Sequence, residues 1–434
     1  MSRVTGARIP NKKDTNPMLK KPLTAVAVAS LLTLTACGNG SGSGDAETGA
    51  DGVAMGPGVT DDQISVTVIS DFSGPIAQGG IAGSLGVEAK IDAVNREGGI
   101  CGRKVVVDKR DTKYDPQITT QQYRAAAPKN LMVAQFVGTA GLNAVQANIK
   151  RDNMPTLSAS INTQTLDLPN VYVAMPPFEV ELINGLTWAA EQAGASAQKT
   201  VNVGFVTSAD ETGKLYLDAL NHAAEATEGV KVVARPTYTN ADTDFTAQIN
   251  SLKDAGAQIV MLGVTPAQTS GIIGQSAQFG YKPTFVSTSG AWSSSLAKPL
   301  DGLLADYYVS GGYGTLNDDN AGIKALTKAR EAYAPDAKPD NFEVGGWING
   351  TVVVEALRKA CEAKDLTRDG VKKAMTDLKV TFDDIQPQID LGDGDSIVSF
   401  QSRINKIGED GVQVPVASFF ESDAAKSWDE SRGK

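Results

Sequence analysis

The sequence predicts an α/β protein of two lobes, each with a parallel sheet covered by helices. Three observations predict this class. The chain has 434 residues, short β-branched runs alternate with helical runs from Ile64 onward, and Met175-Pro176-Pro177 divides the alternation into two series. A chain of this length is long enough for two or three domains. Strands that alternate with helices build a parallel sheet, because each strand returns to the sheet through a helical crossover.

The composition excludes several classes of function. The chain is 41% hydrophobic and 21% charged, so it can bury sizeable cores. Lys and Arg number 40 against 50 Asp and Glu, and this acidic balance argues against a nucleic-acid partner. One histidine, His222, and three cysteines leave little material for His-based catalysis or a zinc site. We therefore expect no catalytic residues, no metal and no cofactor.

The N-terminus predicts export and a lipid anchor. A basic segment precedes the uncharged run Leu23–Ala36, which is typical of a signal peptide over residues 1–36. The run ends in Leu34-Thr35-Ala36-Cys37, which resembles the bacterial lipobox and implies that Cys37 becomes lipidated. The alternative is a plain exported protein with a chance cysteine. Residues 37–59 are rich in Gly and Ser and are expected to form a flexible tether.

The first series of elements begins after this tether. Its strands and helices are expected at Ile64–Ser70, Gly79–Glu97, Lys104–Asp108, Pro116–Asn130, Met132–Val137, Asn143–Asp152 and Pro155–Ser158.

The second series follows the two prolines. Its elements are expected at Glu179–Ala193, Val201–Val206, Gly213–Glu228, Val230–Tyr238, Phe245–Ala255, Ile259–Leu262, Pro266–Phe279, Thr284–Ser287 and Asp306–Ser310. Three more helices are expected at Ala321–Tyr333, Glu343–Glu362 and near Arg368–Leu378, before antiparallel strands over Gln386–Phe420.

Several motifs in this order resemble one family, the solute-binding proteins of branched-chain amino-acid type ABC transporters, which are Leu/Ile/Val-binding-protein-like. The motifs are Phe72–Gly80, Asn95–Arg103, Asp111–Pro116, Val137-Gly138 and Asp242–Leu252. The resemblance implies the type I periplasmic-binding-protein fold, with two Rossmann-like lobes joined by three crossing strands that act as a hinge. It places lobe 1 at residues 60–176 and 316–379. Lobe 2 then takes residues 177–315 and 380–434, the latter including a C-terminal tail.

The candidate ligand-binding residues of lobe 1 follow its strands. Ligands of open α/β sheets bind beyond the carboxyl ends of the strands. The candidates are Phe72, Ser73, Gly74, Asn143, Ser158, Ala159 and Ser160. For Ser73 and Gly74 the alternative is a turn that only shapes the strand exit. For Asn143 it is a helix N-cap, and for Phe72 it is core packing.

Lobe 2 supplies Thr212, Thr265, Ser289 and Trp292 by the same argument. Relatives that bind amino acids often carry an acidic residue near Ser289, which this sequence lacks. An unpaired buried ammonium is costly, so an amino-acid ligand is in doubt. Glu179 could substitute, although a solvated residue at a helix start is the simpler interpretation. The alternative for Trp292 is core packing.

Cys101 and Cys361 remain after Cys37, and both fall in lobe 1 by this division. An oxidising compartment favours a disulfide between them over two free thiols.

The sequence therefore predicts an extracytoplasmic lipoprotein that belongs to an ABC importer. It would bind a small polar or amphipathic solute, such as an amino acid, an amide or a short organic acid, and deliver it to the permease and ATPase subunits. Its contact with the cell membrane would be the lipid on Cys37. The alternative is a sensor on the same fold that signals to a membrane receptor, and an enzyme is a third, weaker interpretation.

Overall fold

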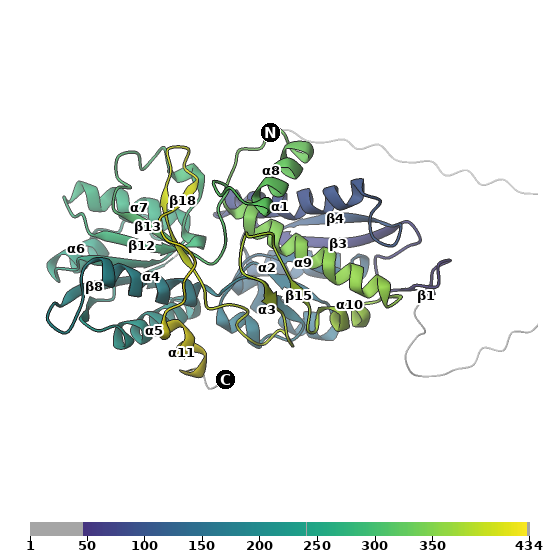
Figure 1. The fold of residues 1–434 in the computed structure, drawn as a ribbon, viewed down its shortest axis with the longest axis horizontal. Helices are drawn as coiled ribbons and strands as arrows, with labels where there is room; N and C mark the ends of the chain where they lie inside the picture. Colours follow the sequence, from purple (N-terminus) through teal and green to yellow (C-terminus); the bar gives the residue numbers. More distant parts are fainter. Residues whose placement is uncertain (1–46, 240, 432–434) are drawn as a thin grey trace, which may run out of the picture. The chain divides into compact units, whose positions relative to one another are not determined.

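The computed structural model describes residues 47–239 and 241–431. They form two α/β lobes, and the colours of Figure 1 show the chain passing from the first lobe to the second and back. The predicted fold class is confirmed. The expected signal peptide over residues 1–36 and the lipidation site Cys37 lie outside the described residues.

Lobe 1 contains a five-stranded parallel sheet in the order β4-β3-β5-β6-β7. Its strands are β3 (Gln63–Ser70), β4 (Lys104–Asp111), β5 (Met132–Phe136), β6 (Thr156–Ser158) and β7 (Val171–Val173). Its helices are α1 (Ala77–Arg96), α2 (Pro116–Ala126), α3 (Thr139–Arg151), α8 (Ala321–Tyr333), α9 (Phe342–Glu362) and α10 (Arg368–Met375).

Lobe 2 contains an eight-stranded sheet in the order β10-β8-β11-β12-β13-β17-β18, with β9 beside β8. Its strands are β8 (Val201–Ser208), β9 (Val230–Ala234), β10 (Thr237–Tyr238), β11 (Ile259–Gly263), β12 (Thr284–Thr288), β13 (Tyr307–Gly311), β17 (Arg403–Ile407) and β18 (Gln413–Pro415). Its helices are α4 (Phe178–Gln192), α5 (Glu211–Ala226), α6 (Thr246–Asp254), α7 (Pro266–Gln278) and α11 (Asp423–Ser431).

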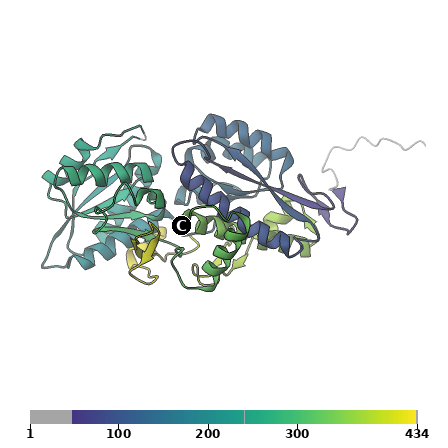
Figure 2. The same ribbon diagram turned by 90° about the horizontal axis from the view of Figure 1, so that it is seen from above.

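Figure 2 shows helices on both faces of each sheet. This arrangement follows from the sequence, because strands covered on both faces are apolar throughout rather than alternating. In β5 all five residues are buried, and the same holds for β11. β17 and β18 pair antiparallel, as the sequence predicted for this part of the chain. The C-terminal helix α11, which the sequence did not predict, contacts α4 and α5.

The third crossing between the lobes falls later than predicted. β15 (Lys379–Val380) pairs with β16 (Ile389–Asp390), and β15 lies against α9 of lobe 1. In the same segment, Gln386 Nε2 donates a hydrogen bond to the Ala174 carbonyl at 2.8 Å. The segment predicted to open the second part of lobe 2 therefore contacts lobe 1. An alternating apolar pattern shows which residues are buried but not which lobe buries them.

Residues 47–59, which were expected to belong to a flexible tether, are instead attached to lobe 1. β1 (Glu47–Thr48) and β2 (Ala54–Met55) pair with each other, and β14 (Asp365–Leu366) of lobe 1 pairs with β2. The Arg103 guanidinium, of which 1% is exposed, forms an ion pair with Asp51 at 2.6 Å. These long-range partners order a segment whose composition alone predicts flexibility.

Cys101 and Cys361, the expected pair, form a disulfide with their Cα atoms 6.2 Å apart. It joins the loop before β4 to the end of α9, both in lobe 1. Within the described ranges, no helix is both long enough and apolar enough to cross a membrane.

Candidate functional site

A cavity of about 350 Å³ lies at the ends of the strands, and both lobes line it. Lobe 1 contributes the starts of α1, α3 and α9 together with the ends of β5 and β6. Lobe 2 contributes the starts of α4, α5 and α7 together with the loops after β8, β11 and β12. This is the position expected for a ligand of two facing α/β sheets.

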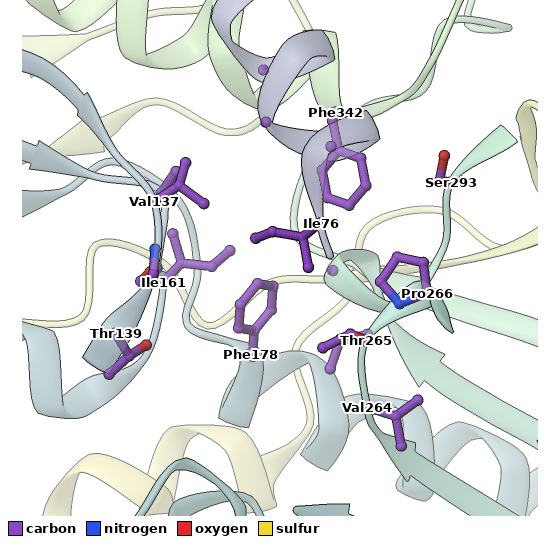
Figure 3. Close-up of a pocket in the computed structure, with 18 of the residues that line it drawn as sticks. Ile76, Val137, Thr139, Ile161, Phe178, Val264, Thr265, Pro266, Ser293 and Phe342 are labelled. Atoms are coloured by element: carbon purple, nitrogen blue, oxygen red, sulfur yellow. The ribbon is translucent and has the colours of Figure 1, made fainter. Parts of the chain in front are cut away.

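The middle of the cavity is apolar. Figure 3 shows Ile76, Val137, Ile161, Phe178 and Phe342 directed towards a common space. They come from five separate places in the chain, so the apolar character is a property of the fold and not of one motif. Such a surface favours the hydrocarbon part of a ligand, because burying apolar area is favourable in water.

Five of the helices that begin at the cavity have no side-chain cap: α1, α3, α4, α7 and α9. In three of them, α1, α3 and α7, the N-cap residue itself lines the cavity, and these residues are Ile76, Gly138 and Thr265. The first N–H groups of a helix have no acceptor within the helix. The helix dipole adds positive potential at the same end, so these helix starts favour a negatively charged or electron-rich group of a ligand.

The polar side chains at the cavity are mostly hydroxyls. Ser160 Oγ accepts a hydrogen bond from the Gly138 N–H at 2.8 Å, which leaves its own proton for another acceptor. Among the lining residues that the structure describes, Asp210 is the one with a charged side chain, and none is Lys, Arg or His. The Asp210 carboxylate already caps α5, accepting from the Gly213 N–H at 3.0 Å. It also accepts from Ser208 Oγ at 2.5 Å.

Four tyrosines line the cavity as neutral phenols: Tyr114, Tyr216, Tyr238 and Tyr313. Burial raises the pKa of each, so none ionises near neutral pH. Tyr114 also has a positive φ of 58°, which is uncommon for a residue with a side chain. Its ring lies against Gly138, where an added Cβ would come within 3.3 Å of it.

A carboxylate does approach Ser289, but from a residue that the sequence did not single out. Glu181, in the first turn of α4, is fully buried. Its oxygens accept from the Ser289 N–H at 2.8 Å, from Ser289 Oγ at 2.9 Å and from the Gly312 N–H at 2.7 Å. Burial raises the pKa of Glu181 to about 8, although these donors act to lower it. Glu181 does not line the cavity.

Glu179 is also buried, contrary to the expectation of a solvated helix start. The Thr163 N–H and hydroxyl donate to its carboxylate at 2.9 and 2.7 Å. Glu179 does not line the cavity either.

Four of the candidate ligand-binding residues line the cavity: Ala159, Ser160, Thr212 and Thr265. Ala159 and Ser160 follow β6, and Thr265 follows β11. Thr212 lies at the start of α5. The structure therefore brings these four together from both lobes.

Three lobe 1 candidates, all in the loop after β3, do not line the cavity. Ser73 Oγ donates to Asp111 at 2.7 Å and the Gly74 N–H donates to Asp71, so the loop after β3 is held by its own neighbours. Phe72 lies in the same loop, with the ammonium of Lys109 5.7 Å from its ring centre. The next residues of this loop, Pro75 and Ile76, line the cavity instead.

The remaining candidates lie away from the cavity lining for separate reasons. Asn143 is inside α3, not at its N-cap, and the buried Ser158 Oγ accepts from the Ser160 N–H at 3.0 Å. Ser289 binds Glu181, as described above. Trp292 is in the core of lobe 2, where its indole N–H donates to the Gly411 carbonyl at 2.9 Å.

The sequence did not predict most of the aromatic and apolar residues that line the cavity, nor the polar Gln135. The aromatic and apolar residues are Ile76, Tyr114, Val137, Phe178, Tyr216, Tyr238, Tyr313 and Phe342. A signal existed for four of these residues. Ile76, Tyr114 and Val137 belong to motifs that carry the family resemblance, and Phe178 directly follows the two prolines. Within the described residues, no cluster of three or more His, Cys, Asp or Glu side chains could hold a metal ion.

Comparison with known proteins agrees with this geometry. Residues 63–411 match the family model described as periplasmic binding protein. Leu/Ile/Val-binding protein homolog 7 of Brucella abortus (strain 2308) is 22% identical over 320 residues, which cover 70% of this chain and 78% of that protein.

Two solved structures are also similar. A fatty acid ABC transporter substrate-binding protein from Thermomonospora curvata is 28% identical, with a TM-score of 0.83 over 88% of this chain and 98% of that chain. A branched-chain amino acid ABC transporter from Thermus thermophilus with bound valine is 18% identical, with a TM-score of 0.73 over 86% of this chain and 99% of that chain. The chain therefore belongs to the periplasmic binding protein family, with the two-lobed type I fold.

Proposed function

We propose that this protein is an extracytoplasmic solute-binding lipoprotein that encloses an amphipathic carboxylic acid between its lobes and delivers it to an ABC permease. One observation carries the ligand class. An apolar wall that includes Ile76, Phe178 and Phe342 adjoins three helix starts without side-chain caps. The helix starts suit the carboxylate, and the apolar wall suits the hydrocarbon chain.

The charges along the cavity distinguish this class from an α-amino acid. Burying an ammonium group is costly unless an opposite charge pairs with it. Glu181, the carboxylate beside Ser289, accepts three hydrogen bonds from the protein and does not line the cavity. Asp210 is engaged at the start of α5. A ligand without an ammonium group therefore fits better.

The volume of the cavity and one structural relative also support an amphipathic carboxylic acid as the ligand. A cavity of about 350 Å³ falls within the range of about 300–1,000 Å³ that is typical of small-molecule sites. The Thermomonospora curvata protein, described as a fatty acid binder, is 28% identical over 88% of this chain.

The proposed lipid anchor is supported by the sequence, and the proposed delivery of the ligand to a permease is supported by the family. The segment ending in Cys37 resembles a lipobox. ABC transporter substrate-binding proteins are among the structural relatives. In this proposal the lipid on Cys37 keeps the protein at the membrane surface, and closure of the lobes around the ligand creates the form that the permease recognises.

Isothermal titration with straight-chain acids tests the ligand class. Each added methylene that enters the apolar part contributes about 0.8 kcal/mol, so we expect Kd to fall about fourfold per methylene from butanoate to octanoate. 2-Aminooctanoate and octylamine serve as an amino acid and a cation of similar apolar size. Tighter binding of either than of octanoate would contradict the proposed class.

A matched pair of variants tests the site. Phe178→Ala removes an apolar wall of the cavity and should weaken octanoate binding by about tenfold or more. Phe279→Ala removes a phenylalanine that is 37% exposed and does not line the cavity, so its Kd should equal that of the wild type. If both variants lose affinity for octanoate equally, or if neither loses affinity, the cavity is not the binding site.

A further inference from the structure

One part of the cavity extends into lobe 1 between α1 and α9. We call this part the inner end, and define it by Gly83, Gln135, Met175, Gly345 and Gly346, all of which line the cavity. A Cβ built on Gly346 would lie 1.9 Å from the Gly83 carbonyl, and one on Gly345 would lie 3.5 Å from Met175 Sδ. These five residues are therefore close together, and the glycines let the backbones of α1 and α9 pack in contact at this end.

The inner end has two polar groups, the amide of Gln135 and the hydroxyl of Tyr313, which would lie 3.7 Å from a Cβ on Gly345. Gln135 is on β5 and is 1% exposed. A Cβ on Gly83 would lie 3.0 Å from its Nε2 atom, so the amide lies directly against α1. The described residues form no hydrogen bond with this side chain, although it lines the cavity. The amide is open to the cavity, where its donor and acceptor atoms are available to a ligand.

Asn349, the second buried amide in this region, also lacks partners. Asn349 follows Gly345 by four residues, so it lies on the same face of α9. It is fully buried, and the described residues leave both its oxygen and its nitrogen without a hydrogen bond. No charged residue is among those that define the inner end. Asn349 does not line the cavity, so Gln135 is the amide that a ligand can reach. A neutral amide with both donor and acceptor atoms suits a neutral polar group better than an ion.

The inner end lies away from the helix starts that we assign to the carboxylate. Gln135 lies on β5 and precedes Val137, which follows the strand, by two residues, or about 7 Å along an extended chain. Gly83 follows Gly79 by four residues of α1, which corresponds to about 6 Å along the helix. Val137, labelled in Figure 3, belongs to the apolar part of the cavity. The cavity thus combines helix starts, an apolar part and the inner end.

We propose that Gln135 determines specificity by binding a neutral hydrogen-bonding group, such as a hydroxyl or carbonyl, at the far end of the ligand's chain. The ligand is then a carboxylic acid with a second, uncharged polar group at its opposite end. This inference rests on the proposed function and adds a distinct requirement to it.

Titration of matched acids with and without a terminal hydroxyl tests the proposal. The probes are straight-chain acids of six to ten carbons and the ω-hydroxy acid of each length, measured with the wild type and with Gln135→Met. In the wild type, we expect the best ω-hydroxy acid to bind about tenfold more tightly than the plain acid of equal length, a difference of about 1.4 kcal/mol. In Gln135→Met, whose side chain is of similar length but apolar, the plain acid should bind more tightly.

The outcomes separate this inference from the proposed function. If plain and hydroxy acids bind the wild type equally, or if the hydroxyl preference survives in Gln135→Met, Gln135 is not the determinant and the inference is wrong. If no acid of either series binds, the proposed ligand class fails and the inference fails with it. If the variant does not fold, the side-chain amide ¹⁵N resonance of Gln135 decides. It should shift with the hydroxy acid and not with the plain acid, and equal shifts overturn the inference.

Discussion

The buried Glu181 carboxyl should make the stability of this protein depend on pH in a defined direction. Its pKa rises from 4.5 to about 8 because burial disfavours the charged form. Between these values the folded protein holds a proton that the unfolded chain has released. The contribution of Glu181 to the free energy of unfolding is therefore complete below about pH 4.5, and it is lost as the pH rises through about 8.

The pKa difference sets the magnitude of this effect. A rise of about 3.5 units at about 1.4 kcal/mol per unit corresponds to at most about 5 kcal/mol across the window. Burial also raises the pKa of Asp340, and that of Glu343 to about 7, so both add a slope of the same sign. A comparison of wild type with Glu181→Gln isolates the share of Glu181, because the amide keeps the shape and removes the titration.

Urea unfolding followed by tryptophan fluorescence between pH 5 and pH 8.5, at constant ionic strength, measures the effect. We expect the free energy of unfolding to fall more steeply with pH in the wild type than in Glu181→Gln. Glu355→Gln, which changes a partly exposed carboxylate on α9, should keep the wild-type slope. Parallel curves for wild type and Glu181→Gln would refute the reasoning.

Two further predictions concern stability. Trp292→Ala should lower the free energy of unfolding by about 3–5 kcal/mol, because the indole is buried beside Tyr307 and binds the Gly411 carbonyl, whereas Trp292→Phe should cost less. Urea midpoints measure both, and equal loss in the two variants would contradict a packing role. Replacing both Cys101 and Cys361 by serine should cost about 2–5 kcal/mol by freeing the unfolded chain, while octanoate binding by the folded variant stays unchanged. An unchanged urea midpoint would show that the disulfide does not stabilise lobe 1.

Local sequence patterns predicted most of the fold because the elements themselves are local. Alternating strands and helices, and the two prolines before Phe178, are visible without any tertiary contact. The late third crossing was not visible, since β15 and β16 are short and their burial depends on α9. The ordering of residues 47–59 depends on β14 and on Arg103, which lie far along the chain.

The site was harder to predict than the fold. Ser160 and Thr265 follow strands, so the carboxyl-end rule was enough to find them. Phe342 begins α9, which belongs to lobe 1 but comes much later in the chain. Gln135 lies inside β5, a strand whose apolar sequence is typical of a protein core. Trp292 follows a strand as Ser160 does, but the distant Gly411 carbonyl holds its ring in the core.

The attachment of β1 and β2 to lobe 1 has a mechanical consequence. The ion pair between Arg103 and Asp51, the pairing of β2 with β14 and the disulfide at Cys361 all lie towards the C-terminal end of α9. Phe342, at the other end of this 21-residue helix, is about 30 Å away and lines the cavity. The chain therefore enters lobe 1 beside the end of α9 that lies away from the cavity, so an attachment there leaves the cavity-lining end of the helix free of it.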